Sequence, residues 1–242
     1  MNTLVVVPAF NEEKSIVSVI QAVRETGLDV IVVNDGSSDK TAHMARSEGV
    51  RVLTLPFNAG VGSALRCGFR YAVDHGYDAV IQVDADGQHS PDEASKLIEV
   101  AEGGLFDLVI GSRFANGADV QYVSSVRRIP MRIISRVASR AAGTTLTDVT
   151  SGFRLISGEL LKNFSSRFPQ YYLGDTFEAT YVAGKAGYRI AEVPVVMSPR
   201  TNGRSSASVR EAILMIAKTL VVTVFGLHFR IPHKASQNGM SV

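Results

Sequence analysis

Short apolar runs that alternate with helical patterns constrain the fold of this chain more than any other feature. Over the first 111 residues, β-branched runs occur at 3–7, 30–33, 50–55, 79–83 and 108–110. Helical patterns lie between them, at about 12–25, 40–47, 61–74 and 91–101. Strands that are apolar at nearly every position are buried on both faces. The alternation therefore predicts an α/β fold with a mostly parallel central sheet flanked by helices.

The second half of the chain is less regular. It contains a helical pattern at 126–142, a loop that enters a strand at 148–156, a helix at 175–187, a strand at 188–196 and an apolar helix at 209–226. We expect a catalytic domain over 1–206, then a C-terminal apolar helix over 207–228 that is interfacial or packs on protein, then a flexible tail over 229–242.

Composition excludes some classes of protein. The net charge of the 242 residues is only +2, and no basic patch carries interleaved aromatic residues, so we expect no nucleic-acid partner. The single cysteine, Cys67, leaves no disulfide within the chain, as is typical of a reducing compartment. The N-terminus has no basic head before its first strand and does not resemble a signal peptide. We therefore expect a cytoplasmic protein.

Polar residues follow four of the expected strands at the point where each strand ends. Ligands of parallel α/β sheets bind beyond the carboxyl ends of the strands, so chemistry is expected at these positions. The four sequences are PAFNE at 8–12, NDGSSD at 34–39, DADGQH at 84–89 and GSR at 111–113.

Asp84 and Asp86 are the most informative pair. Two carboxylates this close repel each other unless a cation or hydrogen-bond donors lie between them. Mg²⁺ binds one or two carboxylates together with substrate phosphates, so the pair predicts a divalent ion that bridges a diphosphate. A turn or helix cap is the alternative. It accounts for the residues from Ser90 onward but leaves Asp84 and Asp86 unexplained.

Asp35 can accept hydrogen bonds from a nucleotide base or a ribose hydroxyl. The alternative is a sharp turn at Gly36 followed by a helix cap, and for Asp39 capping explains the residue equally well. The Gly-rich sequence at 58–62 either lets the backbone approach a ligand closely or forms a structural turn.

Taken together, these sequences resemble family 2 glycosyltransferases, and within them the dolichol-phosphate mannose synthase and polyprenyl-phosphate glycosyltransferase branch. The resemblance spans about residues 3–206. It is carried by VPAFNEE at 7–13, NDGSSDKT at 34–41, NAGVG at 58–62, DADGQH at 84–89, GSR at 111–113, DVTSGFR at 148–154, EVPV at 192–195 and RTNGRS at 200–205. The chain differs from the best-known lipid-phosphate enzymes in lacking a membrane-spanning hairpin and in having Ser206 where a lysine often follows the serine.

The resemblance implies a nucleotide-diphospho-sugar transferase (GT-A type) fold, inversion at the sugar carbon, and Mg²⁺ or Mn²⁺ as cofactor. The implied nucleotide-binding residues are Pro8, Ala9, Asn11, Glu12, Asp35, Gly36, Gly60 and Asp84. The implied metal ligands are Asp84, Asp86 and Gln88, and the implied catalytic residues are Asp86 and Arg113, with Asp175 joining them for a hydroxyl acceptor. The implied acceptor or phosphate ligands are Arg128, Arg132, Ser135, Arg154, Arg200 and Ser205. Arg127 takes the place of Arg128 or Arg132 if the register slips.

Arginines recur every four residues at Arg128, Arg132, Arg136 and Arg140, which keeps them on one slowly drifting helix face. Like charges at this spacing repel, and a lipid phosphate or an anionic membrane surface would offset the repulsion. The alternative is the solvated basic face of a surface helix.

We therefore expect an inverting glycosyltransferase that moves a sugar from a GDP- or UDP-sugar to a polyprenyl phosphate at the inner face of the membrane, with a membrane protein as a further partner. The alternative is a sugar hydroxyl acceptor in cell-surface polysaccharide synthesis. A hydroxyl acceptor needs a base, and Asp175 is the candidate, although it equally caps the helix that follows it. A phosphate acceptor is already an anion and needs none.

Overall fold

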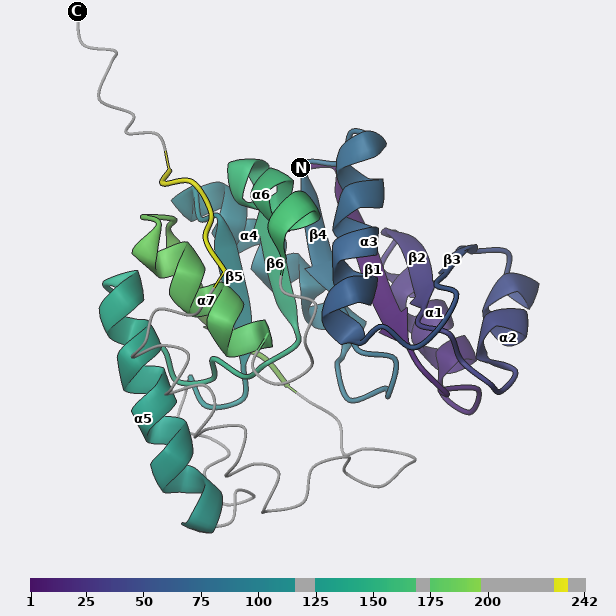
Figure 1. Cartoon of the computed structure of the whole chain (residues 1–242), viewed down its shortest axis with the longest axis horizontal. Coiled ribbons are helices and arrows are strands. Elements are labelled where there is room, and N and C mark those ends of the chain that lie inside the picture. Colours follow the sequence, from purple (N-terminus) through teal and green to yellow (C-terminus); the bar gives the residue numbers. More distant parts are fainter. Residues whose placement is uncertain (116–124, 169–174, 197–228, 235–242) are drawn as a thin grey trace, which may run out of the picture.

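A computed structural model of the chain describes residues 1–115, 125–168, 175–196 and 229–234 (Figure 1). For residues 125–130 and for Asp175 it describes the backbone alone. The expected apolar helix at 209–226 lies outside the described residues.

A seven-stranded sheet, in the order β3-β2-β1-β4-β6-β5-β7, forms the centre of the described chain. The strands are β1 (Thr3–Ala9), β2 (Asp29–Asn34), β3 (Arg51–Thr54), β4 (Ala79–Gln82), β5 (Leu108–Ser112), β6 (Arg154–Ser157) and β7 (Ile190–Pro194). All neighbouring pairs are parallel except the two that β6 makes with β4 and β5. The expected mostly parallel sheet is confirmed. The reversed β6 between β4 and β5 was not expected.

The helices are α1 (Ile16–Glu25), α2 (Thr41–Ser47), α3 (Val61–Asp74), α4 (Ala94–Gly104), α5 (Ser125–Ala142), α6 (Gly158–Arg167) and α7 (Asp175–Lys185), with a short 3₁₀ turn at η1 (Pro91–Glu93). All were expected within a few residues except α6. Its ten residues turn only Leu160, Leu161, Phe164 and Ser165 into the core, which is too short an apolar stripe to stand out in the sequence.

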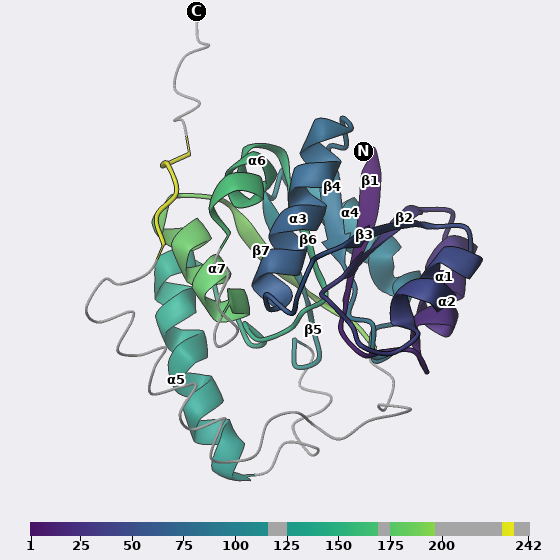
Figure 2. The same cartoon turned by 45° about the vertical axis from the view of Figure 1, so that its right-hand side comes forward.

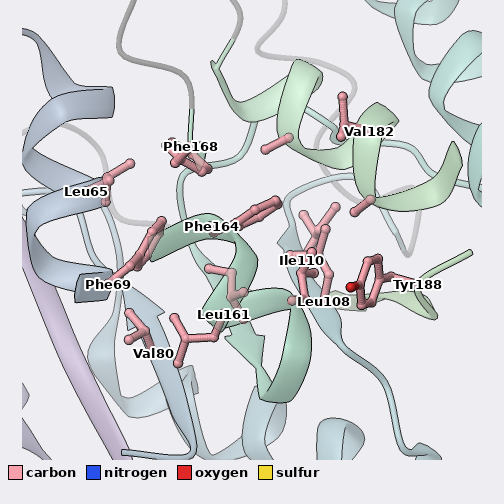
Figure 3. Close-up of a cluster of buried hydrophobic side chains, with 14 of the residues drawn as sticks. Leu65, Phe69, Val80, Leu108, Ile110, Leu161, Phe164, Phe168, Val182 and Tyr188 are labelled. Carbon is pink, nitrogen blue, oxygen red and sulfur yellow. The ribbon is translucent and has the colours of Figure 1, made fainter. Parts of the chain in front are cut away.

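The two faces of the sheet carry separate cores because neighbouring residues of a strand point to opposite sides. Val6 and Val80 face the core formed with α3, α5, α6 and α7, whereas Val7 and Ile81 face the core formed with α1, α2 and α4. Figure 3 shows the first core, where aromatic side chains from α3 and α6 approach each other. The rings of Phe69 and Phe168 meet edge to face with centroids 5.2 Å apart.

Residues 229–234 pack on the body of the protein, although we expected a flexible tail from residue 229. Phe229 packs beside Phe164, with ring centroids 6.1 Å apart, and its N–H donates to Glu178 Oε1 at 3.0 Å. Lys234 Nζ lies 2.7 Å from Asp107 Oδ2, and its N–H donates to the carbonyl of Ala186 at 2.8 Å. This segment, drawn in yellow in Figure 1, therefore belongs to the folded domain.

The topology gathers several loops at one edge of the sheet. The parallel strands β1, β2, β4, β5 and β7 all end there, and β6, which runs the other way, begins there. The sequence before β6 therefore joins the loops that follow the parallel strands. Strand order also reverses between β1 and β4, which is where ligands bind in open α/β sheets. Within the described residues, no helix is both long and apolar enough to cross a bilayer.

Candidate active site

The loops that follow β1 and β2 are joined by hydrogen bonds into one unit. Asn11 has a positive φ of 56°, its N–H donates to Ser37 Oγ at 3.0 Å, and its Oδ1 accepts the N–H of Ser38 at 2.9 Å. The N–H of Glu12 donates to Thr41 Oγ1 at 2.8 Å. Asn11 and Glu12 thus lie at the edge we expected, and these hydrogen bonds hold the two loops together.

Asp39 caps the start of α2 and holds the loop after β1. Its carboxylate accepts the N–H of Thr41 at 2.9 Å and the N–H of Glu13 at 3.2 Å. Burial alone would raise the pKa of Asp39, but these bonds and the one from the Thr41 hydroxyl outweigh it and hold that pKa below its usual value. Of the two interpretations left open for Asp39, these contacts favour capping.

Asp35 is buried at the end of β2 and holds the Gly-rich turn. Its Oδ1 accepts the N–H of Ala59 at 2.8 Å and its Oδ2 accepts the N–H of Gly60 at 2.9 Å. Gly36 has φ +67°, and a Cβ there would lie 2.4 Å from the carbonyl carbon of Phe57. Only glycine allows this approach. Each carboxylate oxygen of Asp35 keeps a second lone pair, so its nucleotide contact stays a prediction.

Two aromatic side chains are exposed beside this unit. Pro8 and Ala9 are buried at the end of β1, but the next residue, Phe10, is 42% exposed. Phe57, whose backbone packs on Gly36, is 67% exposed. A rigid loop that presents aromatic rings to solvent is suited to stacking on a flat ligand.

The carboxylate of Asp84 lies just beyond β4 and is held from several sides. Its Oδ1 accepts Gln82 Nε2 at 3.2 Å, and its backbone N–H donates to His89 Nδ1 at 3.0 Å. Gly152 lies directly against it, because a Cβ there would be 2.5 Å from Asp84 Oδ2. The side chain remains 40% exposed. Asp84 is therefore oriented by the protein while it still faces the solvent edge.

Asp86 lies two residues further on, in the turn that leads to η1. Its Oδ1 accepts the N–H of Gln88 at 3.0 Å, which closes the turn. The described residues contain no cluster of three or more His, Cys, Asp or Glu side chains able to hold a metal on their own. Mg²⁺ does not need one when phosphates supply the other ligands. The donor set of Asp84 and Asp86 fits that mode of binding, and Gln88 as a third ligand stays a prediction.

Arg113 lies at the end of β5 and is fixed by a chain of charged contacts. Its Nε lies 2.7 Å from Asp148 Oδ2 and its Nη2 lies 3.0 Å from Oδ1, a bidentate pair with a fully buried carboxylate. Glu192 of β7 accepts the N–H of Asp148 at 2.6 Å and the N–H of Thr147 at 2.8 Å. Three segments of the chain thus combine to place one guanidinium.

The guanidinium of Arg113 stays charged despite its surroundings. Burial would lower the pKa of Arg113, but the hydrogen bonds and charge of Asp148, together with the charge of Asp84, raise it overall. Its side chain is 37% exposed. A permanent cation is therefore presented close to the Asp84 carboxylate, as a site for phosphate oxygens requires.

The expected acceptor residues that the structure describes differ in exposure. Arg132 is exposed on α5, whereas Ser135 on the same helix is buried and donates to the carbonyl of Thr147 at 3.2 Å. Arg154 is 1% exposed, and its guanidinium donates to the backbone carbonyls of Ser151 and Thr176. This arrangement favours a structural role for Arg154 over the phosphate contact we expected.

Some predicted site residues cannot be placed. Arg200 and Ser205 lie outside the described residues, as do the side chains of Arg128 and Asp175. Other residues at the site were not singled out from the sequence, namely His89, Asp148, Gly152 and Glu192. All four belong to the sequences that carry the family resemblance, which was the available signal, but their partners depend on the reversed β6 and on β7.

A family model for glycosyl transferase family 2 matches residues 4–164. The chain is 30% identical over 229 residues to the undecaprenyl-phosphate mannosyltransferase of Micrococcus luteus, covering 90% of this chain and 93% of that protein. It is 28% identical over 228 residues to the polyprenol monophosphomannose synthase of Mycolicibacterium smegmatis, covering 89% and 86%.

The fold also matches solved structures. One is glucosyl-3-phosphoglycerate synthase from Mycobacterium tuberculosis in complex with Mn²⁺, uridine diphosphate and phosphoglyceric acid. The TM-score is 0.69 at 23% identity, and the match covers 93% of this chain and 78% of that one. At this identity the likeness bears on the fold alone.

Proposed function

Because the chain belongs to glycosyl transferase family 2, we propose that it transfers a sugar from a nucleotide-diphosphate sugar to a polyprenyl phosphate. The observation that carries the proposal is the meeting of an oriented acidic side chain, Asp84, and a permanent cation, Arg113, at one edge of the sheet. Such an edge is suited to a diphosphate whose charge must be held and then stabilised as it leaves.

The nucleotide of the donor binds at the unit formed by the loops after β1, β2 and β3. Asp35 fixes the Gly-rich turn, and the remaining lone pairs of its carboxylate would accept hydrogen bonds from base or ribose donors. Phe10 and Phe57 present exposed rings beside the same loops. The base is a guanine or a uracil, and the donor screen described below decides between them.

Asp84 and Asp86, with Gln88, would hold Mg²⁺ or Mn²⁺ together with the donor diphosphate. When bound, the ion stabilises the negative charge that develops on the leaving nucleoside diphosphate. The side chains contribute orientation: Gln82 and His89 hold Asp84, and Asp148 holds Arg113 toward the phosphates.

The acceptor phosphate attacks the anomeric carbon on the side opposite the leaving group, so the sugar carbon is inverted. The anionic acceptor needs no base, whereas a sugar hydroxyl would need one. Arg113 stays protonated throughout, because Asp148 and Asp84 raise its pKa, and it supplies charge to the phosphates without exchanging a proton.

The lipid acceptor places the enzyme at the inner face of the membrane. The exposed residues Arg132, Arg136 and Arg140 follow one side of α5, with Ile133 exposed beside them. One end of this helix extends well away from the sheet in both views (Figures 1 and 2). Each basic side chain near an anionic lipid surface contributes about 1 kcal/mol of attraction. The apolar segment at 207–228 adds an interfacial anchor or a contact with a membrane partner protein.

A donor screen tests the proposal. Radiolabelled GDP- and UDP-sugars are incubated with the protein, polyprenyl phosphate and Mn²⁺, and label is counted in the organic phase. We expect transfer from one nucleotide class, and loss of transfer by at least about 10²-fold in Asp84→Asn. Exposed Asp92→Asn, on η1, is the matched control and should keep full activity. Label that enters only water-soluble saccharide would contradict the lipid acceptor.

A second variant separates the two acceptor classes. Asp175→Asn removes the candidate base while it keeps the size of the side chain. With a phosphate acceptor, kcat should change little. A loss of transfer with unchanged donor affinity would favour the hydroxyl acceptor and a role for Asp175 as base.

A further inference from the structure

We propose that His89 is a positioning residue that holds the carboxylate of Asp84 in the orientation required to bind a divalent ion. The inference rests on the proposed function, because it presumes that Asp84 is a metal ligand. His89 itself would not touch the ion or the substrate.

His89 is enclosed by the protein. It lies between the end of β4 and η1 and is only 6% exposed, and its ring packs on that of Phe153 with centroids 5.3 Å apart. A histidine buried this fully keeps a fixed ring plane, so both of its nitrogens have defined directions.

One ring nitrogen of His89 is hydrogen-bonded to Asp84. Nδ1 accepts the backbone N–H of Asp84 at 3.0 Å, so the proton of the neutral ring must lie on Nε2. Nε2 lies 3.6 Å from Asp84 Oδ2, which is beyond hydrogen-bond distance, so the ring lies beside the carboxylate without donating to it. His89 thus acts on Asp84 through the backbone N–H, which fixes the position from which the carboxylate extends.

Gln82 completes the support on the other carboxylate oxygen. It is 2% exposed and donates Nε2 to Asp84 Oδ1 at 3.2 Å, while its own Oε1 has no hydrogen-bond partner among the described residues. Leaving a buried acceptor unpaired is unfavourable. Turning the amide over would set its oxygen against the carboxylate, so the contact with Asp84 fixes the amide orientation.

Gly152 closes the remaining side without adding a side chain, because any Cβ there would meet Asp84 Oδ2 at 2.5 Å. His89 at the backbone, and Gln82 and Gly152 at the carboxylate, together hold Asp84 at the open edge, where 40% of its side chain is exposed. Residues that hold metal ligands in this way typically contribute about 10–100-fold to metal affinity.

Three substitutions test the Nδ1 contact. His89→Leu removes both nitrogens, His89→Asn keeps an acceptor near the Nδ1 position, and His89→Gln keeps a polar group near the Nε2 position but no acceptor near Nδ1. The readouts are Mn²⁺ affinity in the presence of UDP or GDP, followed by electron paramagnetic resonance of free Mn²⁺, and nucleotide affinity without metal, by calorimetry. The matched control is His75→Leu, because His75 is an exposed histidine at the C-terminal end of α3.

We expect His89→Leu and His89→Gln to weaken Mn²⁺ affinity by about 10–100-fold, with a smaller loss in His89→Asn, which keeps the acceptor, and no change in His75→Leu. Nucleotide affinity without metal should stay the same in all of them. Wild-type Mn²⁺ affinity in all three His89 variants would overturn the inference, as would a parallel loss of metal-free nucleotide binding and thermal stability in all three. If the wild-type protein binds no Mn²⁺ with either nucleotide, the result contradicts the metal site of the proposed function rather than the role of His89.

Discussion

Gly36 is required for two separate reasons, and they can be measured apart. Its φ of +67° strains any other residue, and an added Cβ would also meet the backbone of Phe57. Gly27 has φ +77° but nothing within 4 Å of its added Cβ, so Gly27→Ala carries the strain without the clash. Strain of this kind costs about 1–3 kcal/mol.

We therefore expect Gly36→Ala to lower the free energy of unfolding by more than Gly27→Ala, as measured in urea. The excess reports the close approach of two loops that bind the nucleotide in the proposed function. Equal losses in the two variants would mean that the loops separate easily.

For Gly152 we expect the reverse of Gly36, namely a small effect on stability and a large effect on metal-dependent binding. An alanine Cβ there meets only the end of the Asp84 side chain, which can move, so the free energy of unfolding should change little. The displaced carboxylate should weaken Mn²⁺-dependent nucleotide binding by about 10-fold or more. Gly103→Ala, in α4 with no neighbour within 4 Å, is the matched control for both measurements. Unaltered Mn²⁺ dependence in Gly152→Ala would argue against Asp84 as a ligand.

Asp39 gives the protein a defined response to acid. Its folded-state pKa is depressed, so its stabilising effect is present above the unfolded value of about 3.9 and is lost as pH falls through the lower folded value. The difference in unfolding free energy between wild type and Asp39→Asn should stay constant above about pH 5 and shrink below pH 4. A difference that stays constant down to pH 2 would mean that Asp39 is not held by its hydrogen bonds.

At the residue scale, the sequence was sufficient to predict that Asp84 and Asp86 lie at the carboxyl end of a strand, because they directly follow an apolar run; their role as metal ligands stays a prediction. It was not sufficient to find their supports. Gly152 lies 68 residues from Asp84, and its contact exists only because β6 pairs with β4. His89 was within the sequence motif, but its burial against Phe153 could not be known from neighbouring residues.

Among the elements, β6 shows where pattern analysis stops. Its four residues include the buried Arg154, so the strand is neither uniformly apolar nor alternating. The parallel strands were predictable because each is an apolar run that adjoins a helical pattern, and all but β1 lie between two such patterns. A strand was expected near residue 156, but its reversed direction was not, because its place between β4 and β5 is set by pairing across the sheet.

The carboxylate of Glu192 connects β7 to the loop that carries Asp148. It accepts two backbone N–H groups and the Thr147 hydroxyl. An amide in its place would turn an NH₂ group toward at least one of these donors, and each unpaired buried group costs about 1–3 kcal/mol. We expect Glu192→Gln to lower the free energy of unfolding by that amount and to reduce kcat through misplacement of Arg113.

Exposed Glu25→Gln, at the end of α1, is the control for a change of charge alone. Unfolding in urea and donor turnover together check the prediction for Glu192. A loss of kcat with full stability would mean that Glu192 acts at the site more directly than through Arg113.

At the scale of the whole domain, the contacts of residues 229–234 contribute to stability. Lys234 pairs with Asp107 at the start of β5, and Asp107 also accepts the N–H of Arg189 before β7. Both partners are only partly exposed, at 23% and 13%, so the pair contributes more than a surface ion pair. We expect Lys234→Met to lower the free energy of unfolding by about 1–2 kcal/mol and to lower the melting temperature with it.

The matched control is Lys185→Met, because Lys185 is exposed at the end of α7. It should change neither the melting temperature nor the free energy of unfolding. If both lysines behave alike, residues 229–234 rest on the domain without stabilising it. The composition of this segment gave no sign of its contacts, since its one buried aliphatic side chain, Ile231, stands between the exposed residues Arg230 and Pro232.

The reversed β6 also determines at what length the growing chain can complete its central sheet during synthesis on the ribosome. The donor half of the sheet, β1 to β4, is complete by residue 82, whereas the strand that fills the gap beside β4 ends at residue 157. Until then the nascent chain exposes a bare apolar edge on β4, the kind of edge that recruits other chains. Ribosome-bound chains that end between residues 82 and 157 should therefore depend most on chaperones. Pairing of β6 with β4 should end that dependence.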